Sequence, residues 1–383
     1  MKNSVKLPFA LAVLSIALLG CSGKNSLKVE QPKPNPLPKI EVTQSLQQVF
    51  STSVAASNKK DDALRYQLAQ AEGIYYSVDP KGEVSAFDGK KRLWKVRPSK
   101  SLTAGVTVGE GVVLVANQKG LLFALDAQIG QTLWQQQLTA AVLSPSLVLQ
   151  SRAITTANDG TVYAHDVQSG QLIWTFRIPD TSFGVRGYAM PAMLDTRTVA
   201  VAGANAYVYA LDVITGAPRW QRRVAVNDGR GDIQRLIDID GAPIVVGSKM
   251  ISVSYQGQVT AIDIDNQSVL WSEKASSLNS PAADNQAVYV ANTNGHLVAY
   301  DLYNGQKLWE NTELAYRQLS NPVVLGQSLV VGDYQGVLHL LDPRTGKITG
   351  RAKTSGDVRT LRVEDNLLYV ATRKGQFSVW QNH

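Results

Sequence analysis

An aspartate recurs along this chain with a period near 40 residues. The copies follow short alternating apolar stretches and are separated by 38, 40, 46, 51, 38 and 41 positions: Asp88, Asp126, Asp166, Asp212, Asp263, Asp301 and Asp342. A period of this length with strand-type alternation is typical of a β-propeller, in which each repeat forms one four-stranded blade. We therefore expect an all-β fold built of four-stranded antiparallel blades.

Glycines frame most of these aspartates. Six positions earlier, a glycine follows turn residues, as in ANDG and NTNG, and predicts a tight hairpin: Gly82, Gly120, Gly160, Gly257, Gly295 and Gly336. Four positions later, D-x-x-x-G predicts a second hairpin: Gly130, Gly170, Gly216, Gly305 and Gly346. Aspartate accepts hydrogen bonds from turn amides, and glycine tolerates the left-handed backbone. Ala206 and Gln267 each replace one of these glycines.

A tryptophan follows eight positions after most of the aspartates: Trp134, Trp174, Trp220, Trp271 and Trp309. Trp94 comes two positions early, behind the shortened turn DGKKRLW. One indole per outer strand predicts a docking ring that lies flat across the seam to the next blade and donates its N–H to a partner there. An aromatic ligand platform would not need one copy per repeat, so we assign these tryptophans a structural role.

The period continues once more near the end of the chain. Gly375 leads FSVWQ and puts Gln381 where an aspartate is expected, so the eighth repeat lacks its fourth strand. Residues 41–55 contain Phe50 and, four positions later, Val54, which matches the spacing of Trp134 and Leu138. We expect this segment to supply the missing strand and close an eight-bladed ring, since closure removes open sheet edges.

The first residues predict a lipoprotein signal. Lys2 and Lys6 precede an apolar run of about thirteen residues (7–19), which is shorter than the roughly 20 needed to span a membrane. The run ends in Leu-Leu-Gly-Cys21, which resembles the lipobox of bacterial lipoproteins, and Ser22 favours the outer membrane by the sorting rule of enteric bacteria. We expect residues 1–20 to be the signal, 21–39 a lipidated, proline-rich tether, and 40–383 the propeller.

Composition gives little support for catalysis or for nucleic acid. The net charge of +7 is spread without a Lys/Arg block, and the single cysteine is the expected lipid site. His165, His296 and His339 fall in the third strands of different blades, and no metal-binding or nucleotide-binding motif stands in a suitable context. We expect no metal, no cofactor and no nucleic-acid partner.

Two consecutive inter-blade connections, 175–190 and 221–242, are longer than the others and predict one patch between blades three and five. Phe183, Val185 and Arg186 form an apolar tip with an arginine. The second connection has a charged and apolar edge: Arg235, Leu236, Asp238, Ile239 and Asp240. Arginine beside apolar residues is common at interface anchors. The alternative is a solvated strand face in which Arg186 pairs with one of the aspartates.

The repeat resembles the tryptophan-docking repeat of quinoprotein (PQQ) dehydrogenases, which would imply an enzyme that holds PQQ and calcium. This chain has no vicinal cysteine pair and is shorter than those enzymes, so PQQ-dependent catalysis is the alternative. The whole mature chain resembles the BamB family, lipoprotein subunits of the machinery that inserts β-barrel proteins into the bacterial outer membrane. The resemblance is most specific in SFGVRGYAMPA (182–192) and GDIQRLIDIDGAPIVV (231–246).

The BamB resemblance implies a non-catalytic scaffold on the periplasmic face of the outer membrane. In that family a leucine–x–leucine–arginine loop and an aspartate–x–aspartate loop contact the POTRA domains of BamA. The corresponding residues here are Phe183, Val185 and Arg186 in the first loop and Asp238 and Asp240 in the second. The charged members match, whereas the two leucines are replaced. Unfolded barrel proteins are a second expected partner, bound by strand addition to exposed edges.

Overall fold

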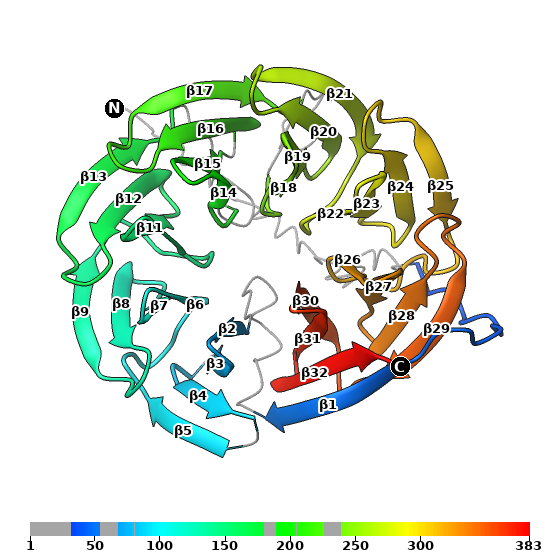
Figure 1. Ribbon diagram of the computed structural model, residues 1–383, viewed down its shortest axis with the longest axis horizontal. Helices are drawn as coiled ribbons and strands as arrows, with labels where there is room; N and C mark the ends of the chain where they lie inside the picture. The colour runs from blue at the N-terminus through cyan, green and yellow to red at the C-terminus, as the bar shows by residue number, and fades with distance from the viewer. Residues whose placement is uncertain are drawn as a thin grey trace, which may run out of the picture. The chain divides into compact units, whose positions relative to one another are not determined.

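The computed structural model describes residues 32–53, 68–79, 81–89, 91–179, 189–203, 205–225 and 239–383. The chain divides into two compact units, Met1–Lys33 and Pro34–His383, and the second is a ring of eight four-stranded antiparallel sheets (Figure 1). Within the described ranges, every regular element is a strand. The predicted eight-bladed propeller is confirmed.

The strands run from the axis outward in each blade. Blades 1 to 4 contain β2 (Ala69–Ala71), β3 (Ile74–Val78), β4 (Val84–Asp88) and β5 (Lys91–Val96); β6 (Ala104–Gly109), β7 (Val112–Ala116), β8 (Leu121–Asp126) and β9 (Thr132–Gln137); β10 (Leu147–Leu149), β11 (Arg152–Thr156), β12 (Thr161–Asp166) and β13 (Leu172–Arg177); β14 (Ala192–Asp195), β15 (Thr198–Ala202), β16 (Tyr207–Asp212) and β17 (Pro218–Arg223).

Blades 5 to 8 contain β18 (Ile244–Val246), β19 (Lys249–Val253), β20 (Gly257–Asp263) and β21 (Ser268–Ala275); β22 (Ala282–Ala283), β23 (Ala287–Ala291), β24 (Leu297–Asp301) and β25 (Lys307–Asn311); β26 (Val323–Leu325), β27 (Ser328–Gly332), β28 (Val337–Leu341) and β29 (Ile348–Lys353); β30 (Val358–Glu364), β31 (Leu367–Thr372), β32 (Gln376–Asn382) and β1 (Leu46–Ser53).

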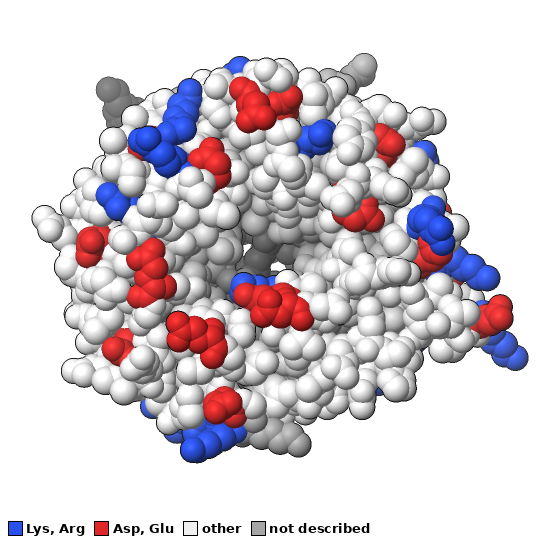
Figure 2. Space-filling view, in the orientation of Figure 1, with Lys and Arg blue, Asp and Glu red and all other residues white. Residues whose placement is uncertain are grey.

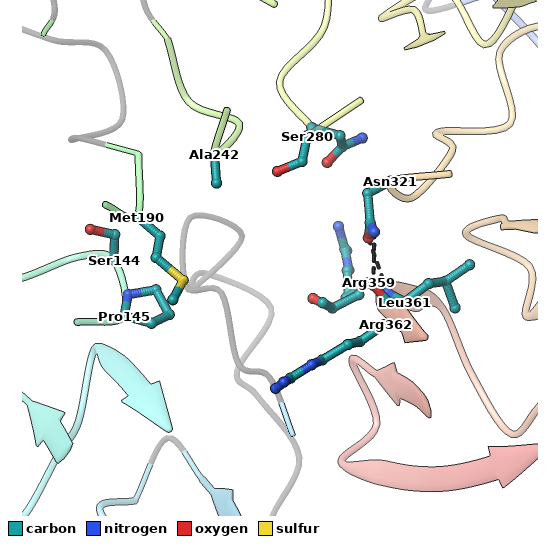
Figure 3. A pocket seen from close by; sticks show the side chains of 11 residues that line it. Ser144, Pro145, Met190, Ala242, Ser280, Asn321, Arg359, Leu361 and Arg362 are labelled. Atoms are coloured by element: carbon teal, nitrogen blue, oxygen red, sulfur yellow. Dashed lines mark hydrogen bonds between the residues drawn. The ribbon is translucent and has the colours of Figure 1, made fainter. Parts of the chain in front are cut away.

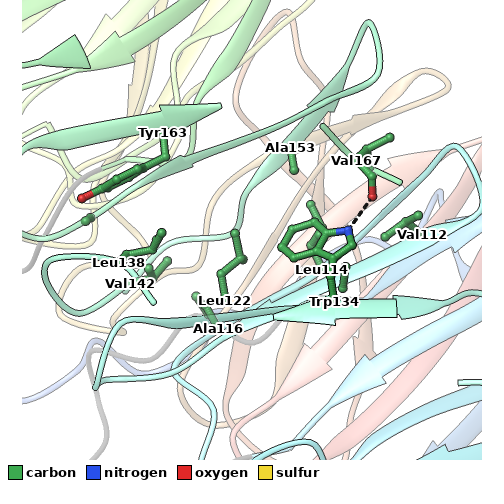
Figure 4. Close-up of a cluster of buried hydrophobic side chains, with 13 residues drawn as sticks. Val112, Leu114, Ala116, Leu122, Trp134, Leu138, Val142, Ala153, Tyr163 and Val167 are labelled. Carbon is green, nitrogen blue, oxygen red and sulfur yellow. Dashed lines mark hydrogen bonds between the residues drawn. The ribbon is translucent and has the colours of Figure 1, made fainter. Parts of the chain in front are cut away.

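The recurring tryptophan joins each blade to the next one. Trp134 on β9 is buried, and its Nε1 donates to the carbonyl of Val167 in blade 3 at 2.9 Å (Figure 4). Four other indoles donate in the same way to the following blade: Trp94 to Ala127, Trp174 to Val213, Trp271 to Leu302 and Trp309 to Pro343. The predicted seam-crossing role of the tryptophans is confirmed at these five seams.

The D-x-x-x-G turn serves the same seam. Asp126 Oδ1 accepts the backbone N–H groups of Gln128 and Ile129 at 2.8 and 3.0 Å. Gly130 has a φ of 74°, and a Cβ placed on it would lie 2.6 Å from the ring of Trp94. Glycine is therefore required here twice over, because the turn needs the left-handed backbone and the preceding blade's indole covers the residue.

Strand β1 closes the ring as predicted. It pairs antiparallel with β32, with Gln47 opposite Gln381 and Phe50 opposite Val379. Phe50 is 8% exposed, and its ring stacks on Tyr75 of blade 1 at a centroid distance of 5.8 Å. The two ends of the propeller therefore meet in a single sheet (Figure 1).

Residues 34–45, which we call the N-terminal strap, lie against the outside of blades 6 and 7. Thr43 and Gln44 donate backbone N–H groups to the carbonyl of Thr349 at 2.9 and 3.2 Å. Leu37 and Ile40 pack on the hydrophobic cluster of these blades. The sequence predicted a tether as far as residue 39. An extended, proline-rich segment leaves its carbonyls unpaired, and here side chains of the propeller bond them.

Candidate partner-binding site

Both long connections start and end within blades 3 to 5. The first runs from β13 to β14 and the second from β17 to β18. Most of the predicted contact residues lie outside the described residues: Phe183, Val185, Arg186, Arg235, Leu236 and Asp238. The structure describes the base from which the two connections rise.

That base is a single packed cluster. Ala189, at the end of the first connection, and Ile239, at the end of the second, are each 1% exposed and belong to the same buried group as Trp220 and Met250. The described ends of the two connections therefore lie in one packed cluster.

Two members of the charged and apolar edge, Ile239 and Asp240, lie inside the protein. Ile239 is fully buried, and Asp240 is only 3% exposed. Behind them, a Cβ on Gly241 would lie 2.5 Å from the backbone of Asn279, so the chain is already pressed against blade 6. The alternation of Asp238 and Asp240 in the sequence is typical of a solvated strand face, whereas the chain is already buried at residue 239. Burial of a carboxylate is costly unless its charge is satisfied. Asp240 therefore restricts the conformations available to the residues around it.

A cavity of about 200 Å³ lies between the inner ends of several blades (Figure 3). Met190 and Ala242, where the two connections rejoin the blades, form part of its wall. Arg359 and Arg362 are the charged lining residues, and Arg362 also pairs with Glu364 at 3.1 Å. The side chain of Asn321 donates to the carbonyl of Leu361 at 2.8 Å and joins blade 7 to blade 8 at this wall. The base of the connections is therefore next to a small polar depression.

The histidines are occupied by structural contacts. His165 on β12 stacks on Tyr163, and burial lowers its pKa to about 4. His339 on β28 is fully buried and bonds Asp333, and burial lowers its pKa as well. His296, just before β24, pairs with Glu310 at 2.7 Å. Within the described ranges, no three His, Cys, Asp or Glu side chains gather as a metal site would require.

Charge on the face of the ring is mixed. Figure 2 shows acidic and basic side chains scattered over this face without a block of one sign. Among the described residues, exposed side chains also form ion pairs, such as Arg177 with Asp159 at 3.1 Å and Lys95 with Glu83 at 3.3 Å.

Comparison with known proteins decides the family. The family model described as "Outer membrane protein assembly factor BamB" matches residues 80–311 and 304–381. The chain belongs to the BamB family. The BamB of Salmonella typhimurium is 31% identical over 377 residues, covering 95% of this chain and 96% of the relative. The BamB of Escherichia coli K12 is 32% identical over 354 residues, covering 89% and 90% of the two chains.

Solved structures agree with this membership. The crystal structure of BamB from Moraxella catarrhalis matches with a TM-score of 0.82 and 35% identity over 88% of this chain and all of that one. The quinohemoprotein alcohol dehydrogenase of Comamonas testosteroni matches with a TM-score of 0.65 at 14% identity, covering 88% of this chain and 76% of that one. At that identity the likeness concerns the fold alone. Among the residues described, no helix combines the length and apolar character needed to cross a membrane.

Proposed function

We propose that this BamB-family chain is a non-catalytic scaffold that binds the periplasmic POTRA domains of BamA through its two long connections. The common base of those connections carries the proposal: Ala189 and Ile239 pack in one buried cluster, so both loops rise from one rigid support. Loops on a rigid scaffold are favoured binding elements because little ordering is needed when a partner arrives.

Each predicted contact residue receives a role in this scheme. Phe183 and Val185 supply apolar contact, and Arg186 supplies a charged hydrogen-bond donor at the tip of the first connection. Arg235 and Asp238 supply complementary charge on the second. Asp240 acts differently from the family expectation, since it is only 3% exposed and packs within the base of the connection.

The test is copurification of BamA with the wild-type chain and with Arg186→Glu. A desolvated charge contact is worth about 2–5 kcal/mol, so its loss should reduce BamA recovery at least about tenfold. Arg344→Glu is the matched control, because Arg344 has a side chain 81% exposed in a turn of blade 7, away from the connections. All three proteins should have equal melting temperatures.

The possible results separate the claims. Loss of BamA with Arg186→Glu alone supports the proposed patch. Equal recovery with all three proteins keeps BamA as the partner and moves its site elsewhere on the ring. If the wild type recovers no BamA, the partner itself is wrong.

The scheme also places the chain on the periplasmic face of the outer membrane through a lipid on Cys21. The lipobox-like string before Cys21 and the proline-rich segment after it support this anchoring. Several acyl chains on one cysteine would give a lasting anchor, whereas a single chain holds only marginally. Cys21→Ala should move the protein from the membrane fraction to the soluble periplasmic fraction, and retention in the membrane would contradict the anchor.

A girdle of exposed aliphatic residues supports a second partner, unfolded barrel proteins. Five outermost strands expose the residue that precedes the docking tryptophan, with exposures from 40% to 49%: Leu93, Leu133, Ile173, Leu270 and Leu308. These strands are terminal in their sheets, so their outer edges have no strand neighbour. An open edge with aliphatic side chains suits strand addition by an extended, apolar chain.

A photoreactive residue tests this second partner. Placed at Leu133, it should crosslink to nascent barrel proteins. The same probe at Gln128, in the neighbouring exposed turn, is the control and should capture far less. Capture of BamA alone from Leu133 would count against strand addition.

A further inference from the structure

The N-terminal strap leaves the propeller at a defined point. Asn35 donates its backbone N–H to Ala315 at 3.0 Å and its side-chain amide to Thr312 at 3.1 Å. Both acceptors belong to the connection between blades 6 and 7. The first residues of the compact unit are thus held to one sector of the ring, immediately after the segment that leads back to Cys21.

Two arginines fix the strap from the propeller side. Arg317 donates Nη1 to the carbonyl of Asn35 at 2.9 Å, and Arg351 donates Nη1 to the carbonyl of Pro38 at 2.8 Å. Arg317 is 2% exposed and is held by Asp333, which is fully buried, at 2.7 Å. A guanidinium that is itself fixed by a buried carboxylate gives its remaining donors a set direction.

The strap is far around the ring from the first long connection. It lies on blades 6 and 7, whereas that connection joins blades 3 and 4 (Figure 1). Three blades separate blade 7 from blade 3 in either direction around the ring. Blade 3 therefore lies on the side of the ring opposite blade 7, to which the strap is bound.

The linker between Cys21 and the compact unit is short. Twelve residues, 22–33, lie between Cys21 and the compact unit, which reach about 37 Å if they are extended at roughly 3.1 Å each. Tyr316, 43% exposed, lies next to the strap's acceptor Ala315. Tyrosine is favoured at membrane–water interfaces because its ring is apolar and its hydroxyl is polar.

We propose that the strap directs the rim of blades 6 and 7 towards the lipid surface and holds the rim of blade 3, with the first connection beside it, away from that surface. Arg317 and Arg351 are the positioning residues of this orientation. The inference rests on the proposed lipid anchor at Cys21. It adds that the anchor sets which side of the ring faces the membrane, as well as keeping the protein there.

Energy transfer to a lipid-borne acceptor dye tests the orientation. The lipidated full chain is reconstituted in phosphatidylethanolamine–phosphatidylglycerol vesicles, with a donor dye on Arg344→Cys or on Gln168→Cys. These residues are both exposed and stand two positions after the turn aspartates of blades 7 and 3. We expect energy transfer from position 344 to exceed that from position 168 by roughly twofold or more, since a short linker limits rotation of the ring relative to the membrane.

Two strap variants show whether the strap is the cause. Replacing residues 34–44 with an equal number of Gly and Ser residues keeps β1 but removes the strap's contacts, and should abolish the difference between the two labels. Arg351→Met, a milder change, should reduce it. Thermal melts check that each variant remains folded.

The outcomes distinguish this inference from the proposed function. Protein that does not float with the vesicles contradicts the anchor and, with it, the orientation. Floating protein with equal transfer from both labels overturns the orientation alone. A difference that survives replacement of the strap overturns the assignment of Arg317 and Arg351.

Discussion

The seam between blades 2 and 3 and the seam that follows blade 7 occupy equivalent places in the ring but are built differently. In the first, the indole of Trp134 covers Gly170 and donates to Val167. In the second, the residue eight positions after Asp342 is Gly350, and a Cβ there would fall on the carbonyl of Gln44 in the strap. A large side chain fills one seam, and a stretch of backbone fills the other.

The difference follows from how blade 8 is assembled. A docking tryptophan needs the D-x-x-x-G turn of the next blade, and blade 8 has no such turn because its fourth strand is β1, which is not joined to β32 by a hairpin. In its place, His383 and Ser45 bond to each other, with the backbone N–H of His383 donating to Ser45 at 3.1 Å. Blade 7 therefore has glycine where a tryptophan would have nothing on which to dock.

The largest effect should come from the repeated seam. Trp134→Ala should lower the free energy of unfolding by about 4–5 kcal/mol, because Gly170 has no side chain with which to refill the cavity. Denaturant unfolding measures it. Leu133→Ala, at an exposed neighbouring position, should change stability by no more than about 0.5 kcal/mol. Equal effects of the two substitutions would contradict the docking role.

The closing strand should respond almost as strongly. Phe50→Ala removes a buried ring that stacks on Tyr75, and should cost about 3–4 kcal/mol. Its neighbour Val49 is exposed, so Val49→Ala serves as the control. An unchanged melting temperature for Phe50→Ala would show that the ring does not depend on β1 for closure.

Restoring the tryptophan of the repeat in blade 7 should destabilise the protein. Gly350→Trp places an indole where the strap backbone lies, and overpacking of this kind costs about 1–3 kcal/mol. The displaced strap should become sensitive to trypsin at Lys39, which is exposed. Greater stability in the variant would mean that the introduced indole stabilises the protein more than the displaced contacts of the strap do.

The smallest effect concerns pH. A hydrogen bond from Arg219 at 2.7 Å holds the pKa of Asp212, in the turn covered by Trp174, at about 2. A lowered pKa contributes stability that is present above about pH 4 and lost as pH falls towards 2. Asp212→Asn should therefore reduce the loss of unfolding free energy between pH 4 and pH 2 by about 1 kcal/mol, the size expected for a partly exposed pair. Melting curves recorded across this pH range measure it.

The same titration sharpens the comparison of the seams. Blade 8 has Gln381, a residue of β32 that does not titrate, where the repeat has an aspartate, so this position contributes no such pH dependence. Gln381→Ala should leave the pH profile unchanged. An altered slope between pH 4 and 2 would mean that Gln381 influences the titration of carboxylates elsewhere in the protein.

Local pattern predicted most of the fold. The aspartate, glycine and tryptophan spacings predicted the blade count, the turn at Gly130 and the closing strand with Phe50, because each follows from a spacing that repeats along the chain. Counting eight positions from Asp342 could also have drawn attention to Gly350. The strap could not be predicted, because its carbonyls bond arginines about 280 and 310 positions away. The burial of Ile239 was missed for a related reason, since it depends on packing with residues of blades 4 and 5 such as Trp220 and Met250.

The closure of the ring also has a consequence for the order in which the chain is made. Gln47 meets Gln381 across 334 positions, so β1 emerges first and waits for almost the whole polypeptide before its partner exists. Pairings of such separation are slow to form, and an unpaired strand is prone to associate with other chains. The protein should thus gain protease resistance in a single late step, only after β32 has been made and can pair with β1.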